Sequence, residues 1–276
     1  KNLYEPLIRR SAGLGKPPKN FRSKSTHQHH NTDVVIIGAG LSGLAAAKKF
    51  INTKYKVLLI EQDSYLGGVL KNSNKVKTIN GLTPQEWISE TEELILNSKN
   101  ITILKNTLVT TYNFTNHLIA LEDKFAGKKI DLNKSELTLH KIRTSNTIIT
   151  NGHIERFISF RNNDLPGVML ASSFEKYIHR YGVVPEKEPV IFTNNSSSLS
   201  LLKTLINLGC KPKAYVDSRK KDNIETEIKK ILKDKEIPFF SDAEIEGCDG
   251  SKKVETITIR QGKIFTKLKT SMLCVS

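Results

Sequence analysis

Residues 33–61, DVVIIGAGLSGLAAAKKFINTKYKVLLIE, decide the fold of this chain. Residues 34–37 are an apolar run typical of a buried parallel strand, and Gly38, Gly40 and Gly43 follow it in GxGxxG spacing. The first glycine permits a tight turn, the second lets the backbone approach a pyrophosphate, and the third lets a helix pack close to the strand. The stretch therefore predicts a dinucleotide site, the alternative being a glycine-rich turn in some other α/β domain.

A helix and a second strand complete this unit. The helix is predicted over residues 41–52, and its first residues, Leu41 and Ser42, would bring free amides and the positive end of the helix dipole to the phosphates. Residues 57–60 form the second strand, and Glu61 ends it where a carboxylate can accept hydrogen bonds from a ribose diol. Gln62 is assigned to the same site and offers no positive charge.

The bulk composition limits the class of protein. A chain of 276 residues with 38% apolar content can bury one large or two modest domains. The formal net charge of +15 could indicate nucleic acid or an anionic membrane, but the lysines are scattered and no basic run is interleaved with aromatic residues. No apolar run approaches the roughly 18 residues of a membrane span. We therefore expect neither nucleic acid nor a membrane as a partner.

Cysteine and histidine usage argues against metal sites and disulfides. Cys210, Cys248 and Cys274 are odd in number and lack CxxC spacing, which is typical of a reducing compartment. Without a signal-peptide core, a cytoplasmic protein is expected. The segment THQHHN, residues 26–31, holds three histidines but no carboxylate or cysteine. It is predicted to be part of a linker, with no metal ligands.

The pattern along the chain predicts an α/β fold with a Rossmann-like parallel-sheet domain, an antiparallel excursion and a second, degenerate Rossmann-like unit. The predicted parts are an N-terminal segment and linker (1–32), a dinucleotide-binding domain (33–183), the second unit (184–270) and the start of a strand returning to the first domain (271–276). Both ends look truncated, so the chain is expected to be a piece of a longer protein.

Two stretches inside the first domain complete its predicted sheet. Alternating segments between residues 107 and 142 predict a three-stranded antiparallel excursion, and residues 147–150 predict a separate strand that returns to the sheet.

The second unit lacks the glycine fingerprint. Residues 190–193, 197–208 and 214–216 repeat the strand–helix–strand order, and Asn194, Ser196 and Leu199 stand at the three glycine positions. Side chains there obstruct a pyrophosphate and push the helix from the strand. This unit is predicted to keep the fold without the cofactor.

Four stretches resemble the alpha subunit of heterotetrameric sarcosine oxidase. They are YEPLIRRSAGLGKPP near the start, IIGAGLSGLAAA, NGHIERFISFRNNDLPGVMLASSFEKYIHRYGVVP and VIFTNNSSSLSLL. The resemblance implies that the chain is the middle of a subunit whose other parts are an N-terminal domain and a C-terminal folate-binding domain.

The resemblance also implies a function. The family's enzyme demethylates sarcosine oxidatively to glycine and hydrogen peroxide and passes the one-carbon unit to tetrahydrofolate. FAD and a covalent FMN belong mainly to the beta subunit and its boundary, smaller subunits complete the complex, and the alpha subunit holds NAD. Carried over to this sequence, Gly38, Gly40 and Gly43 would meet the pyrophosphate, Glu61 the adenosine ribose, and the backbone of Val109 the adenine. No catalytic residue is assigned to this chain.

Three further residues are assigned to the cofactor site. Gly68 belongs to a glycine pair that would let backbone pass near the pyrophosphate, or would simply form a turn. Thr150 and Gly152 lie at the returning strand, where related sequences carry Ala-Thr-Gly and this one carries Thr-Asn-Gly.

Two other functions compete with NAD binding. The same glycines would suit FAD in a flavoenzyme of the amine, proline or opine dehydrogenase class, because the fingerprint is shared. A Rossmann-like scaffold without catalysis, whose basic surface recruits partners, is the third possibility.

Overall fold

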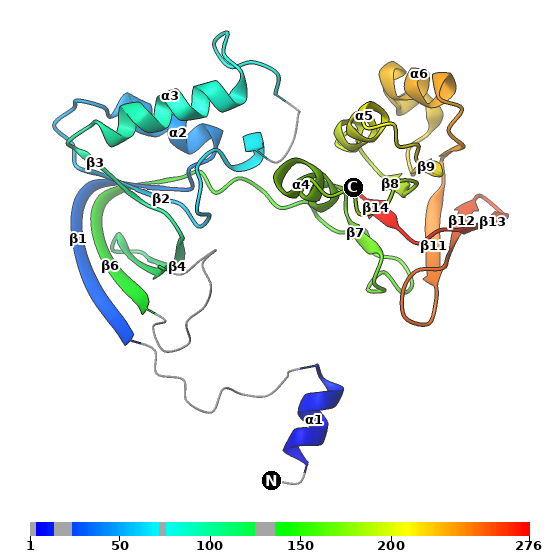
Figure 1. Cartoon of the computed structure of the whole chain (residues 1–276), viewed down its shortest axis with the longest axis horizontal. Helices are drawn as coiled ribbons and strands as arrows, with labels where there is room; N and C mark the ends of the chain where they lie inside the picture. Colours follow the sequence, from blue (N-terminus) through cyan, green and yellow to red (C-terminus); the bar gives the residue numbers. More distant parts are fainter. Residues whose placement is uncertain (1–3, 14–23, 72–75, 125–135) are drawn as a thin grey trace. The chain divides into compact units, whose positions relative to one another are not determined.

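The computed structural model describes residues 4–13, 24–71, 76–124 and 136–276, and Figure 1 traces the chain. The chain forms two compact units. The first comprises Lys1–Leu66 and Glu93–Thr150, and the second comprises Gly67–Glu92 and Asn151–Ser276. The boundary between them passes within helix α3 (Pro84–Leu96). No helix in the described ranges is long and apolar enough to cross a membrane.

A six-stranded mixed sheet organises the first unit, in the order β3-β2-β1-β6-β5-β4. Strands β1, β2, β3 and β6 run parallel, and β4 and β5 join antiparallel at one side. Helix α2 (Leu41–Lys49) contacts β1 and β2, while α1 (Glu5–Ser11) buries none of its residues. The strands are β1 (Lys24–Ile37), β2 (Val57–Ile60), β3 (Ile101–Leu104), β4 (Thr107–Asn113), β5 (His117–Asp123) and β6 (Glu136–Ile149).

Strand β1 begins at Lys24, so the prediction of a linker is wrong for residues 24–32. The polar half of β1 pairs with β6 in parallel, and Figure 1 shows the two long curved strands side by side. Polar side chains meet between them, as in the contact of 2.9 Å between the hydroxyls of Thr26 and Thr138. Residues 24–32 contain no apolar side chain and form a strand by pairing with residues 136–144 of β6, which a search for apolar runs cannot detect.

The antiparallel excursion is confirmed and extended. Strands β4, β5 and the first part of β6 pair as predicted, but β6 continues without a break to Ile149. The predicted separate strand at residues 147–150 is therefore the end of β6, and the excursion belongs to the same sheet as the glycine turn.

The second unit has a five-stranded parallel sheet in the order β10-β9-β8-β14-β7 and a three-stranded antiparallel sheet, β11-β12-β13. Its elements are η1 (Gly68–Lys71), β7 (Val168–Leu170), α4 (Ala171–Tyr181), β8 (Val190–Thr193), α5 (Leu199–Asn207), β9 (Ala214–Asp217), η2 (Lys221–Asn223), α6 (Thr226–Asp234), β10 (Phe239–Ser241), β11 (Glu244–Asp249), β12 (Thr256–Gln261), β13 (Ile264–Lys269) and β14 (Leu273–Val275).

Successive side chains of the parallel strands point to opposite faces of the sheet and contribute to two separate cores. Ile191 packs with α4, α5 and α6 on one face, while its neighbours Val190 and Phe192 pack with β11 and β12 on the other. The predicted parallel α/β unit is thus present as three layers.

Two assignments to the first domain are wrong. Strand β14 pairs with β7 and β8, so residues 271–276 complete the second sheet instead of returning to the first. Helix α4 packs on α5, β7 and β14, so it belongs to the second unit and not to the predicted dinucleotide-binding domain of residues 33–183. A short apolar strand or an amphipathic helix does not encode which sheet it joins. The other domain boundaries stay predictions.

Candidate functional site

The glycine turn after β1 has the backbone conformation that its sequence predicts. Gly38 has φ +96°, a region that L side chains rarely adopt, and its N–H donates to the Ile60 carbonyl over 2.8 Å. The turn is thereby fixed to the end of β2, and the chain enters α2 immediately afterwards.

Gly43 and Gly40 serve different purposes in this turn. A Cβ on Gly43 would lie 1.9 Å from the Gly38 carbonyl oxygen and 2.8 Å from the Thr150 hydroxyl, so only glycine lets α2 pack here. A Cβ on Gly40 would meet no atom within 4 Å. Because the space beside Gly40 is open, a pyrophosphate can approach the backbone there.

The first residues of α2 face the same turn. Gly40 is the N-cap of α2, and its carbonyl accepts the first helical hydrogen bond, from Leu44 N–H, at 2.9 Å. Leu41 and Ser42 follow as the first helical residues, whose N–H groups have no partner inside a helix. Such amides and the helix dipole favour an anion at this position.

Glu61 is buried, with 7% of its surface exposed, and its carboxylate holds the turn. Oε2 accepts the Ala39 N–H at 2.7 Å, and Oε1 accepts the Asp63 N–H at 2.9 Å. Each oxygen keeps acceptor capacity for a further donor such as a ribose hydroxyl. The bracing of the turn by Glu61 is a role that sequence reasoning missed. Gln62 follows and is exposed.

Thr150 braces the turn from the end of β6. Its N–H donates to the Ile37 carbonyl at 2.8 Å, and its hydroxyl lies 2.8 Å from both the Ile37 and Gly38 carbonyl oxygens. A hydroxyl at this position stabilises the turn itself, a role that the sequence does not indicate for Thr150 beyond its predicted cofactor contact.

The structure does not gather every predicted site residue at the turn. Val109 lies in β4, where its side chain packs against the core cluster of Val35, Leu58 and Ile60, and its backbone contact with adenine stays a prediction.

Gly68 and Gly152 belong to the second unit, with φ of +51° and +71°. Beside Gly68, Gly67 has a packing reason of its own, since a Cβ would lie 2.5 Å from Cδ1 of Ile88. The roles of Gly68 and Gly152 at the cofactor stay predictions.

The corresponding turn of the second unit is filled by the chain's own side chains. Asp217, fully buried at the end of β9, is bound bidentately by Arg219, with 3.0 Å from Nε to Oδ1 and 2.8 Å from Nη2 to Oδ2. The hydrogen bonds to Asp217 raise the pKa of Arg219. The guanidinium also reaches the Ser196 hydroxyl at 3.1 Å, and Ser196 bonds to Glu225. Arg219 gave no sequence signal, since a basic residue just after a strand is typical of any loop.

No group of three or more histidine, cysteine or acidic side chains that could hold a metal ion occurs among the residues that the structure describes.

Comparison with known proteins agrees with this geometry. A sequence model of NAD(P)-binding Rossmann-like domains matches residues 36–83. The L-proline dehydrogenase of P. horikoshii aligns with a TM-score of 0.58 at 19% identity, covering 92% of this chain and 43% of that one. The thioredoxin reductase of T. acidophilum aligns with a TM-score of 0.63 at 15% identity, covering 89% and 76%. These solved structures confirm the predicted α/β, Rossmann-like fold.

A curated relative supports the resemblance found in the sequence. The sarcosine oxidase alpha subunit of Rhizobium meliloti (strain 1021) is 31% identical over 270 residues, which are 95% of this chain and 26% of that protein. The chain thus spans about a quarter of the relative's length, and it carries a dinucleotide-binding region of the oxidoreductase type. Over 72% to 95% of its length, the chain is related to one region of the sarcosine oxidase alpha subunits.

Proposed function

We propose that the glycine turn of the first unit binds NAD through its pyrophosphate and adenosine ribose. The observation that carries this proposal is the contrast between Gly43 and Gly40. Backbone atoms occupy the space where a Cβ of Gly43 would lie, whereas the corresponding space beside Gly40 is open. A turn that needed glycine only for packing would not leave the second position open. Buried Glu61 stands beside the turn to accept the ribose hydroxyls.

The wider activity follows from the relationship to sarcosine oxidase alpha subunits. We propose that the chain is a non-catalytic or assisting part of a cytoplasmic complex with beta and smaller subunits, acting on CH–NH groups. That complex would oxidise sarcosine to glycine, form hydrogen peroxide and transfer the one-carbon unit to tetrahydrofolate, using FAD and FMN outside this chain. The Gly68, Val109, Thr150 and Gly152 contacts belong to the same proposal.

FAD is the second candidate for the glycine turn, because it shares the ADP half that the turn would bind. The absorption spectrum of the purified protein, followed by titration with NADH, separates the two cofactors. NAD binding predicts no flavin band in the visible region and a saturable NADH site that Gly40→Ala weakens. A stoichiometric flavin band would show that the turn binds FAD and not NAD. A protein that binds neither nucleotide would favour the non-catalytic Rossmann-like scaffold.

Glu61 is expected to favour NAD over NADP. The 2′-phosphate of NADP would stand about 4 Å from the carboxylate, where like charges repel by roughly 4 kcal/mol at an effective dielectric near 20. Solvent screening reduces this, yet about 1.4 kcal/mol is already tenfold in affinity. Glu61→Gln should narrow the preference for NAD over NADP, as isothermal titration with both nucleotides would measure. It should also weaken NAD binding, because the glutamine amide can accept from only one of the two N–H groups that the carboxylate holds.

A control accounts for the change of charge alone. Glu188→Gln makes the same change at an exposed position of the second unit and should leave both affinities unchanged. If the unmodified protein bound NADP as tightly as NAD, Glu61 would not be the ribose ligand.

One nucleotide site per chain is expected. Arg219, Ser196 and Glu225 occupy the turn of the second unit, and Asp217 is already bound by the chain's own guanidinium. Titration with NADH and with NADPH, followed by fluorescence or calorimetry, should therefore saturate at one equivalent. A second stoichiometric site would show that a nucleotide can displace these side chains from the turn.

A further inference from the structure

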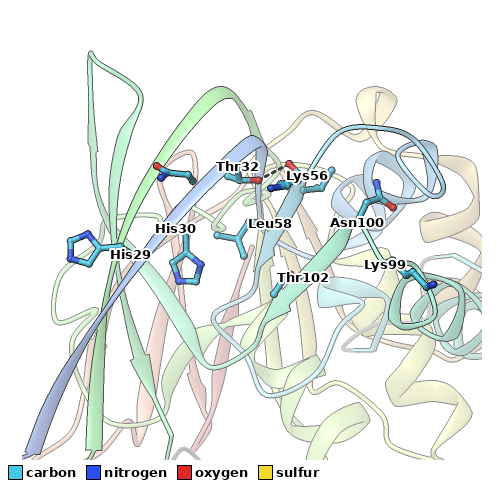
Figure 2. Close-up of a pocket in the computed structure, with 10 residues that line it drawn as sticks. His29, His30, Thr32, Lys56, Leu58, Lys99, Asn100 and Thr102 are labelled. Atoms are coloured by element: carbon cyan, nitrogen blue, oxygen red, sulfur yellow. Dashed lines mark hydrogen bonds between the residues drawn. The ribbon is translucent and has the colours of Figure 1, made fainter.

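A pocket of about 330 Å³ lies at the amino ends of β2 and β3 and beside the middle of β1, residues 29–32, in the first unit. The glycine turn lies at the carboxyl ends of β1 and β2, so the pocket is at the opposite end of the parallel strands. Figure 2 shows Leu58 and Thr102 between His30 and Lys99 in this view, with Lys56 at the rim. A cavity of this size accommodates a small molecule or ion.

The backbone around the pocket is fixed. Lys56 N–H donates to Asp33 Oδ2 at 2.7 Å, and the Lys56 carbonyl accepts the Thr32 hydroxyl at 2.6 Å, the bond drawn in Figure 2. On the β3 side, the Asn100 amide donates to the carbonyls of Phe50 and Tyr55, both at 2.8 Å. The two segments that carry the pocket's lysines are therefore held in place without using the lysine side chains.

Two ammonium groups reach this pocket without a partner of their own. Within the described ranges, the side chains of Lys56 and Lys99 make no hydrogen bond or ion pair. Each ammonium has three donors to offer. Lys56 and Lys99 are both exposed and stand apart along the pocket's lining, and two positive charges on one lining favour an anion with two negative charges.

His30 adds a group that can gain a third positive charge. Its Nε2 lies 2.8 Å from Nδ1 of fully buried His140, whose Nε2 lies 3.2 Å from Glu122 Oε2. Because a carboxylate only accepts, His140 carries its proton on Nε2 and accepts from His30 at Nδ1. His30 then donates through Nε2, and its Nδ1 is left to take up a proton.

Burial, His140 and His29 together lower the pKa of His30, which favours the neutral ring. The other charged groups around the pocket are Lys56 and Lys99 in its lining and Asp33, which accepts from the Lys56 N–H, and Glu122 lies behind His140. A bound dianion would neutralise the lysines and favour the protonated ring.

We propose that the pocket binds a small dianion of the phosphate or sulfate type through Lys56, Lys99 and a His30 that becomes protonated as the dianion enters. One proton is taken up from the solvent at Nδ1 of His30. The Nε2–H of His30 strengthens its bond to His140, and Glu122 compensates the new charge from the far side of His140.

Sulfate is the probe of choice because it stays a dianion at neutral pH, so any pH dependence belongs to the protein. Calorimetric titration at about pH 6 and about pH 8, on either side of the ordinary imidazole range, should show binding about tenfold tighter at the lower pH. Two buffers of different ionisation enthalpy should reveal uptake of about one proton per sulfate. His30→Gln should remove both the pH dependence and the proton uptake.

Matched lysine variants localise the site. Lys56→Gln should weaken sulfate about tenfold while leaving NADH binding unchanged, and Lys230→Gln, the same charge change on exposed α6, should have no effect. Equal losses in the two variants, or binding without proton uptake, would mean an adventitious ion only and overturn the proposal. Competition with inorganic phosphate and glycerol phosphate then distinguishes the sources: equal affinity indicates the free ion, and tighter glycerol phosphate indicates a phosphate ester.

Discussion

Gly43→Ala is expected to abolish nucleotide binding and to lower the free energy of unfolding by about 3 kcal/mol. The added Cβ would stand 1.9 Å from the Gly38 carbonyl oxygen, which is backbone in a turn fixed by hydrogen bonds to Ile60 and Thr150. A gain of up to about 1 kcal/mol in helix propensity does not offset this clash. Urea unfolding and NADH titration measure the two effects.

Gly40→Ala is the matched control for the same turn. Its Cβ meets no atom within 4 Å and its φ of −73° suits alanine, so the free energy of unfolding should not fall. NADH affinity should nevertheless drop more than about tenfold, because the methyl group projects where the pyrophosphate approaches. NADH binding to Gly40→Ala with unchanged affinity would show that the pyrophosphate does not pass this glycine.

The glycine turn could be predicted from the sequence because its backbone conformation and close packing require glycine at particular positions. A positive φ at Gly38 and a missing Cβ at Gly43 leave almost no alternative to glycine. The position of Glu61 followed from the strand before it. The second role of Glu61, accepting the Ala39 N–H, could not be predicted, because the sequence does not show which backbone amides a carboxylate at a strand end will contact.

The polar half of β1 could not be predicted because it depends on tertiary pairing. Residues 24–32 show no apolar alternation, and their strand conformation follows from the partner β6 and from contacts such as His30 with His140. Propensity and periodicity describe how a segment packs against a core, so they do not detect a polar segment that becomes a strand by pairing with another strand. The sheet to which β14 belongs could not be predicted either, because its apolar residues suit either parallel sheet.

The contrast between the two Rossmann-like units was only half predictable. Asn194, Ser196 and Leu199 predict that the second unit has no pyrophosphate site, and the structure adds which side chains occupy that turn. Arg219 supplies the positive charge that the buried Asp217 needs. The Asp217 carboxylate is therefore paired within the second unit, whereas the Glu61 carboxylate of the first unit keeps acceptor capacity for a ligand.

Arg219→Ala is therefore expected to lower the free energy of unfolding by about 3 kcal/mol, the low end for breaking a buried pair, because Arg219 is 21% exposed and water can partly replace it. The remaining donor to Asp217 would be the backbone N–H of residue 219, at 2.9 Å. Arg161→Ala is the control in the same unit. Its pair with Asp249 is 55% and 44% exposed, so urea unfolding should detect a loss of at most about 1 kcal/mol.

A double variant separates the unpaired charge from lost packing. In Asp217→Asn with Arg219→Ala no buried charge is left alone, so the loss should be clearly smaller than for Arg219→Ala by itself. Equal losses in the single and double variants would mean that Arg219 acts through packing and not through Asp217. Neither variant should gain a second NADH site, because the side chains of Asn194 and Ser196 still stand where the first unit has Gly38 and Gly40. Stability and nucleotide stoichiometry, measured on the unmodified protein and on both variants, therefore show whether Arg219 acts by pairing with the Asp217 charge or merely by filling space.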